Sequence, residues 1–260
     1  MRQIACLVSY AGTHFEGFQK QPRGRTVQGE LESAIEKVTG QPTEVHGSGR
    51  TDSGVHAHGQ VFSFYSDASI PPERWPAVLH RWLPQDIVVL KSAEAPSAFH
   101  PRYAAIGKTY RYSIWNSRVS HLFSRAFVYH HPVQLDVSRM NDALSHLIGR
   151  HDFTSFCSVR TASTKSRIRT LRQAEVVEEP VPYPPSTGRL LHLYVSGSGF
   201  LYNMVRIIAG TLIQVGEGKR NPEQMRSILA DRNRQAAGPT ARAEGLTLLS
   251  VDYGELDPFK

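Results

Sequence analysis

Residues 47–59 read GSGRTDSGVHAHG, a polar segment with four glycines, one arginine and one carboxylate. Glycine permits backbone dihedral angles that other residues avoid, so a segment rich in glycine can hold a side chain at a fixed place. The carboxylate of Asp52 lies in its middle, and a fixed carboxylate can act as a nucleophile or as a general base. The segment therefore predicts a loop that presents Asp52.

Other sites can be built from these residues. A dinucleotide fingerprint requires glycine in place of Asp52, and a phosphate-binding P-loop requires lysine in place of Val55, so both are excluded. An aspartic protease needs two carboxylates, which this chain could supply only as a homodimer. Two interpretations stay open, a metal site and an aspartate that merely caps a turn. The candidate metal ligands are His46, Asp52, His56 and His58.

The composition indicates a globular protein of one large domain or two modest ones. The chain has 260 residues, of which 40% are hydrophobic and 20% are charged. Its two cysteines, Cys6 and Cys157, are too few for a disulfide framework, which predicts free thiols in a reducing compartment. The sequence shows neither a signal peptide nor an apolar run of membrane-spanning length. We therefore expect a soluble, cytoplasmic protein with no membrane partner.

A formal net charge of +7 favours a nucleic acid partner, because each Lys or Arg placed against a phosphate releases counterions. Between residues 150 and 172, six basic residues and one acid are interleaved with Ser and Thr, which predicts a phosphate-binding loop. Residues 100–112 combine basic side chains with tyrosines, which suits contact with phosphates and stacking on bases. A solvated face and an ordinary edge strand remain the alternatives. The basic residues are Arg150, Arg160, Lys165, Arg167, Arg169 and Arg172 in the first segment, and Arg102, Lys108 and Arg111 in the second.

Hydrophobic periodicity predicts an α+β fold in two halves of similar plan, residues 1–104 and 105–260. The first half should contain strands at 3–9, near 45, at 60–65 and at 87–91. Its expected helices are 26–38 and one with Trp75, Val78, Leu79 and Trp82 on one face. The second half should contain strand 108–115, helix 137–148, the basic loop and a hairpin of strands 171–177 and 190–195. An apolar helix at 201–215, a helix with Pro222 in its first turn and strand 246–251 complete it.

Arg206 follows Val205 at the margin of the apolar stripe of helix 201–215. A basic side chain at such a margin usually reaches water, and less often it is directed inward at a carboxylate.

Three segments together resemble the TruA family of tRNA pseudouridine synthases. HGSGRTDSGVHAHGQV resembles the catalytic loop of that family, FHPRYAAIGKTYRY its second motif and GSGFLYNMVRIIAGTLIQVGEGK its third. The weaker matches YAGTHFEGFQKQP, HDFTSF and GLTLLSVDY extend the resemblance over nearly the whole chain. The chain departs from the family at Ala11, Phe18, Ser48, Ser53 and Pro101, and Ala11 leaves the role of the first loop open.

The resemblance implies an isomerase that converts uridine to pseudouridine at nucleotides 38, 39 and 40 in the anticodon stem-loop of tRNA. It also implies two pseudo-symmetric halves whose sheets join into one largely antiparallel sheet flanked by helices, the pseudouridine synthase fold. No metal and no organic cofactor are expected, and the partners are tRNA and a second subunit in a homodimer. The alternatives are a catalytically silent tRNA-binding or folding protein on the same scaffold, and a metal-dependent hydrolase.

The resemblance also implies a role for individual residues. Asp52 matches the catalytic aspartate, Arg206 matches the arginine that pairs with it, and Tyr110 matches the tyrosine that stacks on the target base. Arg50 matches an arginine that holds the flipped nucleotide, and Leu246 would form an apolar wall of the pocket. The expected RNA contacts are Phe99, His100, Arg102, Arg160, Lys165, Arg167 and Arg169.

Overall fold

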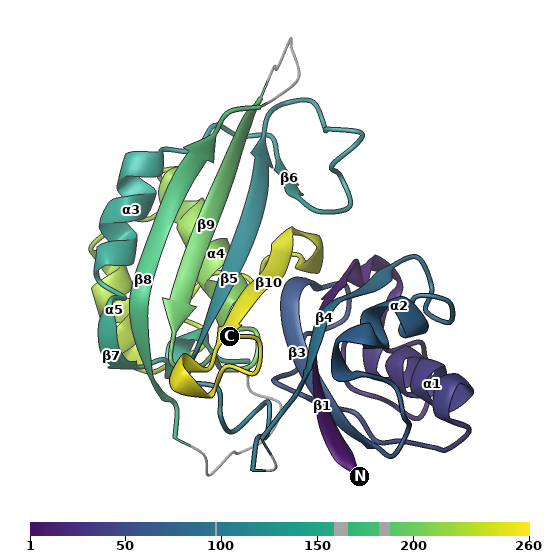
Figure 1. Cartoon of the computed structure of the whole chain (residues 1–260). Coiled ribbons are helices and arrows are strands. Elements are labelled where there is room, and N and C mark those ends of the chain that lie inside the picture. The colour runs from purple at the N-terminus through teal and green to yellow at the C-terminus, as the bar shows by residue number, and fades with distance from the viewer. Residues whose placement is uncertain (97, 159–165, 182–187) are drawn as a thin grey trace. The chain divides into compact units, whose positions relative to one another are not determined.

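A computed structural model describes residues 1–96, 98–158, 166–181 and 188–260. The chain forms two compact units: residues 1–108 with 247–260 make unit 1, and residues 109–246 make unit 2. In each unit, strands that pair mainly antiparallel carry helices on one face (Figure 1), which confirms the predicted α+β class. The predicted division into pseudo-symmetric halves at residue 104 stays a prediction, because compactness does not test a repeat of plan.

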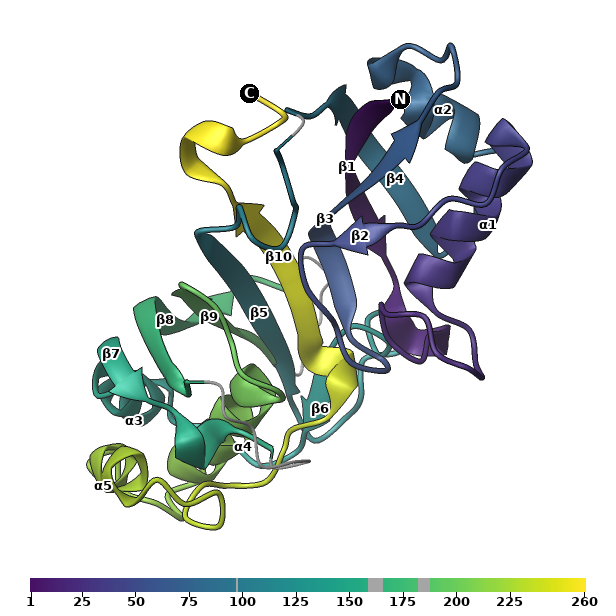
Figure 2. The ribbon, with the colours of Figure 1, turned by 90° about the horizontal axis from the view of Figure 1, so that it is seen from below.

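Unit 1 is built around β1 (Arg2–Tyr10), which pairs antiparallel with β3 (His56–Ser66) and with β4 (Ile87–Glu94). The short strand β2 (His46–Gly47) pairs antiparallel with β3, as Figure 2 shows. The last strand, β10 (Leu246–Asp252), pairs parallel with β3 through Thr247 and Leu248. Helices α1 (Val27–Thr39) and α2 (Trp75–Leu79) cover one face of this unit. The parallel pairing brings the C-terminal segment of the chain beside β3.

Local signals explain α1, whereas α2 is shorter than predicted. The side chain of Thr26 accepts a hydrogen bond from the Gly29 backbone N–H and caps α1, and Gly40 ends this helix with a φ of 74°. Helix α2 ends at Leu79, where a turn leads into Pro84, and Trp82 lies outside it with 48% of its surface exposed. The prediction that Trp82 shares one face of this helix is therefore wrong, because the helix ends three residues before it.

The strands of unit 2 follow the order β5 (Gly107–Asn116), β9 (Arg189–Gly197), β8 (Ile168–Glu179) and β7 (Gly149–Asp152). Strands β8 and β9 are antiparallel, which confirms the predicted hairpin. A short strand, β6 (Tyr129–His131), pairs parallel with β5. Helices α3 (Val137–Ser145), α4 (Met204–Gly216) and α5 (Gln224–Asp231) lie on one face of this sheet (Figure 1).

Several predicted boundaries in unit 2 are corrected. Helix α4 begins at Met204 and not at 201, because Asn203 precedes it with a φ of 60°. Helix α3 ends at Ser145, and Pro222 lies ahead of α5 and not inside its first turn. The segment from 150 to 172 is not one loop, since Arg150 lies in β7 and Arg169 in β8.

Short 3-10 turns connect these elements at Gly12–His14, Pro72–Arg74, Thr154–Phe156, Ala243–Gly245 and Gly254–Leu256. In the described part of the chain, no helix is both long enough and apolar enough to cross a bilayer. Both cysteines are free thiols, and Cys6 is buried.

Candidate functional site

The glycine segment forms a loop that connects β2 to β3. Its last four residues, 56–59, are expected as loop from the sequence but form the start of β3. The Val55 N–H donates to the Asp52 carbonyl at 3.1 Å, and Gly54 has a φ of 77°, so the backbone turns immediately after Asp52. The Asp52 side chain is half-buried and Arg50 is exposed. The backbone turn agrees with both the catalytic and the turn-capping interpretation of Asp52.

The segment YAGTHFEGFQKQP packs directly on this loop, which gives the first loop a structural role. The Phe18 N–H donates to the Thr51 carbonyl at 3.1 Å, and the Gly54 N–H donates to the Phe15 carbonyl at 3.2 Å. Gly17 has a φ of 99°, and a Cβ there would lie 2.7 Å from the Thr51 carbonyl oxygen. These contacts fix the residues on both sides of Asp52, and none of them uses the side chain of Ala11.

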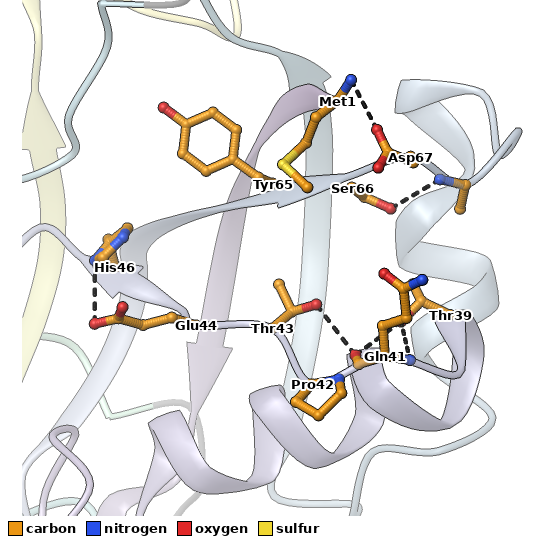
Figure 3. A pocket seen from close by; sticks show the side chains of 11 residues that line it. Met1, Thr39, Gln41, Pro42, Thr43, Glu44, His46, Tyr65, Ser66 and Asp67 are labelled. Atoms are coloured by element: carbon orange, nitrogen blue, oxygen red, sulfur yellow. Dashed lines mark hydrogen bonds and ion pairs between the residues drawn. The ribbon is translucent and has the colours of Figure 1, made fainter.

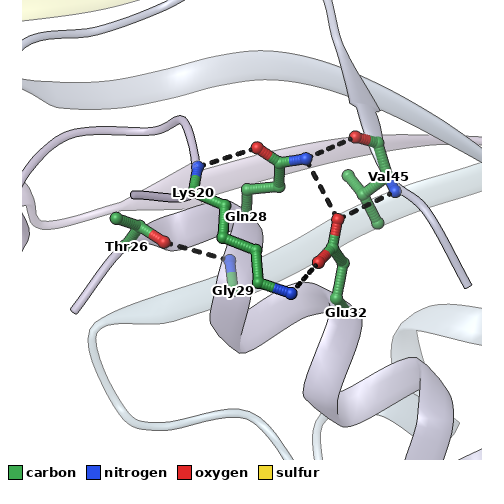
Figure 4. A network of polar contacts seen from close by, with 6 residues as sticks. All are labelled: Lys20, Thr26, Gln28, Gly29, Glu32 and Val45. Atoms are coloured by element: carbon green, nitrogen blue, oxygen red, sulfur yellow. Dashed lines mark hydrogen bonds and ion pairs between the residues drawn. The ribbon is translucent and has the colours of Figure 1, made fainter. Parts of the chain in front are cut away.

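Helix α1 fixes the entry to the loop through its first two turns (Figure 4). The Gln28 amide donates to the Val45 carbonyl at 3.0 Å, and the Val45 N–H donates to the Glu32 carboxylate at 3.3 Å. Gln28 and Lys20 also bond to Glu32, at 3.0 Å and 2.9 Å. Val45 directly precedes β2, so both backbone polar groups of the residue before that strand are held by α1.

Hydrogen bonds of buried polar side chains hold the loop in place. The Ser48 hydroxyl is fully buried and bonds to Gln60, whose amide donates to the Gly49 carbonyl at 3.0 Å. The hydroxyls of Tyr10 and Thr51 bond to each other at 2.7 Å, and burial raises the pKa of Tyr10. A satisfied buried network of this kind is rigid. The loop therefore presents Asp52 from a fixed base.

Lys108 is a further contact of the loop. Its ammonium donates to the Ser48 carbonyl at 2.8 Å. Burial, together with the positive charge of Arg102, lowers the pKa of Lys108 to about 8. The sequence groups Lys108 with the basic residues at 100–112 and does not predict this contact with Ser48.

The four candidate metal ligands do not form a ligand set. The ring Nδ1 of His56 accepts a hydrogen bond from the Gly12 N–H at 3.0 Å, and His58 is exposed. Throughout the described residues, no group of three His, Cys, Asp or Glu side chains is placed to hold a metal ion. The structure therefore gives the metal-dependent hydrolase interpretation no support.

Tyr110 belongs to unit 2 and is 9% exposed. Its ring meets that of Phe200 edge to face, with 5.0 Å between the ring centroids. Phe200 is not among the predicted site residues, although it lies in the GSGF sequence that opens the third motif. The edge-to-face contact leaves Tyr110 little rotational freedom.

Arg206 is half-buried on α4 and fastens the segment that leads to β10. Its Nε donates to the Ala241 carbonyl at 2.7 Å, and its own carbonyl accepts from the Ala241 N–H at 3.0 Å. A second nitrogen of the guanidinium donates to the Asn203 side chain at 3.1 Å. Leu246, five residues after Ala241, is 6% exposed at the start of β10.

The expected RNA contacts in the second motif divide into a buried residue and an exposed cluster. Phe99 is 5% exposed and packs in the core with Tyr253, so most of its ring is turned away from solvent, and its contact with RNA stays a prediction. The His100 ring lies 4.4 Å from that of Tyr103, which is 77% exposed. The guanidinium of Arg102, itself exposed, lies 5.8 Å from the Tyr103 ring. Tyr103 therefore offers an open aromatic face beside a cation.

The basic segment of unit 2 is only partly described, because Arg160 and Lys165 lie outside the described residues. Arg169 is half-buried, and its guanidinium donates to the carbonyls of Ser166 and Ile168 at 2.9 Å and 2.6 Å. The backbone carbonyl of Arg167 accepts a hydrogen bond from the Phe153 N–H at 3.1 Å, and this bond does not involve the Arg167 side chain. Arg169 thus stiffens the start of β8.

A polar surface pocket lies elsewhere in unit 1 (Figure 3). Its carboxylates are already paired, Asp67 with the ammonium of Met1 at 2.7 Å and Glu44 with His46 at 3.8 Å. Apart from His46, its lining contains none of the predicted site residues, and we assign it no role. The lining residues are Met1, Thr39, Gln41, Pro42, Thr43, Glu44, His46, Tyr65, Ser66, Asp67 and Ala68.

Comparison with known proteins adds an independent observation. A family model described as tRNA pseudouridine synthase matches residues 6–104 and 143–254. A protein of Anoxybacillus flavithermus named tRNA pseudouridine synthase A is 48% identical over 254 residues, which cover 97% of this chain and 99% of the relative. The protein of the same name from Bacillus subtilis is 44% identical over 253 residues and covers 96% and 99%.

Among solved structures, a Cbf5-Nop10-Gar1 complex aligns with 80% of this chain and 54% of its own, at 12% identity and a TM-score of 0.33. We draw no argument from a likeness of this size.

Proposed function

The chain belongs to the tRNA pseudouridine synthase family, and we propose that it converts uridine to pseudouridine at nucleotides 38, 39 and 40 of the tRNA anticodon stem-loop. It is an isomerase. The observation that carries the proposal is that the segment matching the catalytic loop of the family is a rigid turn presenting one carboxylate. The reaction breaks the C1′–N1 bond and forms a C1′–C5 bond, so it consumes neither water nor an oxidant.

Asp52 is proposed as the group that starts the reaction. Its carboxylate either attacks C1′ or removes a proton from the sugar, and both routes require an ionised side chain held at a fixed distance from the nucleoside. The contacts of Thr51, Gly54 and Val55 support this role because they immobilise the backbone around the carboxylate.

The other site residues are proposed to act on the same flipped nucleotide. Arg206 would keep Asp52 ionised, since a nearby guanidinium lowers the pKa of a carboxyl group. Tyr110 would stack on the target base, Arg50 would hold the flipped nucleotide and Leu246 would line the pocket. Flipping a base costs a few kcal/mol of unstacking, which such contacts offset.

Release of tritium tests the activity directly. In tRNA labelled with tritium at uridine C5, formation of the new C1′–C5 bond expels the label into water. We expect release from anticodon stem-loops with uridine at positions 38, 39 or 40, and none when all three are cytidine. A protein that binds this tRNA without releasing tritium would instead be the catalytically silent binding or folding protein.

The exposed cluster of His100, Arg102 and Tyr103 is proposed to hold RNA through stacking and charge. Replacing Tyr103 by alanine should weaken tRNA binding roughly tenfold, because stacking on one base contributes about 1–3 kcal/mol. Filter binding at fixed salt measures the effect. Trp82→Ala is the matched control, because it removes another exposed aromatic ring of unit 1. Equal tRNA affinities of Tyr103→Ala and Trp82→Ala would refute a contact between Tyr103 and the RNA.

The basic segment of unit 2 is proposed to contact phosphates. Changing Arg160, Lys165, Arg167 and Arg169 to glutamine should weaken tRNA binding and flatten its dependence on salt. The negative slope of log K against log salt should become shallower by about 0.7–0.9 for each phosphate that the variant no longer neutralises. Arg74 and Arg81, exposed on unit 1, serve as control sites. A slope like that of the wild type would place the segment outside the interface.

We further propose that the chain works as a homodimer in the cytoplasm, with tRNA contacting both subunits. Light scattering with and without tRNA tests the subunit number.

A further inference from the structure

Lys108 reaches the glycine loop from the start of β5. Its Nζ donates to the Ser48 carbonyl at 2.8 Å, and its side chain is partly buried. The described partner of this ammonium is therefore a backbone carbonyl and not a carboxylate. Burying an ammonium is costly unless it is hydrogen-bonded, and the Ser48 carbonyl supplies such a bond.

The ammonium as it is placed leaves no room for a Cβ at residue 49, so an alanine there would displace the end of the Lys108 side chain. A Cβ added to Gly49 would collide with Lys108 Nζ, whereas it would lie 3.7 Å from Lys108 Cε, an ordinary contact distance. The φ of Gly49 is not in the left-handed region, so the backbone conformation alone does not call for glycine. The space that Gly49 leaves open is the space that the Lys108 ammonium occupies.

Two successive carbonyls of the loop are thus held from different strands. Lys108 of β5 bonds the carbonyl of Ser48, and Gln60 of β3 bonds the carbonyl of Gly49 at 3.0 Å. Two fixed peptide groups determine the direction in which the chain continues through Arg50 toward Asp52. Removing the Lys108 bond takes away the described hydrogen bond that orients the Ser48 carbonyl, four residues before Asp52.

We propose that Lys108 is a positioning residue for Asp52. The Lys108 ammonium lies against Gly49 and fixes the loop by donating to the Ser48 carbonyl. The proposal rests on the proposed function of Asp52. It assigns Lys108 no contact with the reacting atoms, so its replacement should slow the chemical step and leave tRNA binding unchanged. Displacing a catalytic group by about 1 Å can cost about 100-fold in rate.

The experiment measures single-turnover pseudouridine formation, tRNA affinity and the free energy of unfolding in four variants and the wild type. The variants are Lys108→Met, Lys108→Arg, Gly49→Ala and the Gly49→Ala/Lys108→Met double variant. Lys108→Met should lower the rate about 100-fold at unchanged affinity. Lys108→Arg keeps a cationic donor and should recover most of the rate.

The double variant separates this role from general damage to the loop. In methionine the Nζ is absent, so an alanine at 49 would no longer collide with the side chain at 108. Gly49→Ala should therefore slow the wild type about 100-fold but leave Lys108→Met no slower than before. The same lack of additivity is expected in the free energy of unfolding.

Wild-type rates in Lys108→Met, or losses that simply add in the double variant, would overturn the proposal. Absence of product from the wild-type protein would overturn the proposed function instead. In that case the free energies of unfolding would still test the contact between Gly49 and Lys108. If the losses in the two single variants added up to the loss in the double variant, the contact would be refuted, and a smaller loss in the double variant would support it.

Discussion

Asp52→Asn is expected to abolish pseudouridine formation while tRNA binding persists. Asparagine has nearly the same shape, so the turn at residues 52–55 should be kept, but its neutral amide neither attacks C1′ nor accepts a proton from the sugar. Removing the group that starts a reaction costs about 10⁴-fold or more in rate. Affinity should remain within a few-fold, because phosphate contacts supply most of the binding free energy of RNA-binding proteins.

The measurement is single-turnover tritium release together with filter binding. Asp52→Ala accompanies the test, because an asparagine before Ser53 can deamidate back to aspartate and alanine cannot. Asp67→Asn is the matched control, since it removes the same charge from an exposed site of unit 1. Turnover near the wild-type rate in Asp52→Ala would refute the catalytic role, and abolished binding in both Asp52 variants would indicate a collapsed loop.

The sequence predicts the parts of the site that depend on local signals. The glycine-bounded turn follows from the residues between 47 and 55 alone, and α1 is placed to within one residue by its cap at Thr26 and its stop at Gly40. The β8–β9 hairpin follows from two apolar runs around a proline-rich connection. Each of these features is encoded within about a dozen residues.

The sequence does not indicate the contacts between distant segments. Lys108 and Ser48 are 60 residues apart, and no periodicity in either segment indicates their bond. Phe99 belongs to a basic, aromatic stretch that suggests an RNA contact, yet its ring is packed against Tyr253 near the end of the chain. Tertiary packing decides which aromatic residue of this stretch faces the core and which, like Tyr103, faces solvent.

The first loop illustrates how a departure from a family pattern becomes interpretable. Ala11 is one of the positions at which the chain departs from the family pattern, and the sequence alone leaves the role of this loop open. In the structure, backbone groups of Phe15 and Phe18 bond to the loop that carries Asp52, and Gly17 approaches Thr51 closely. Backbone contacts of this kind do not depend on the side chain at 11, so an alanine there is compatible with the same support.

Arg206→Met should slow pseudouridine formation by about 10²–10³-fold, the usual loss when one preorganised charged donor is removed from an active site. The guanidinium is proposed to favour the ionised form of Asp52, so without it the pKa of that carboxyl should rise. Activity requires the ionised form, and the acidic limb of the pH–rate profile should therefore move to higher pH. Arg206→Lys keeps the positive charge but lacks the planar guanidinium, so its rate of pseudouridine formation should lie between those of the wild type and Arg206→Met.

Arg206 also bonds to the Ala241 carbonyl, so a purely structural effect has to be separated from the removal of charge. Arg234 offers a matched control, because its guanidinium donates to the Gly238 carbonyl in the same segment at 2.9 Å and it has no proposed role in the reaction. Arg234→Met should therefore leave both the rate and the pH profile near those of the wild type. If both methionine variants were slowed equally with no shift of the acidic limb, the effect would come from the segment at 238–241, and the pairing of Arg206 with Asp52 would be refuted. A shift of the limb in Arg206→Met alone, absent in the lysine variant, would identify the positive charge as the property that the reaction needs.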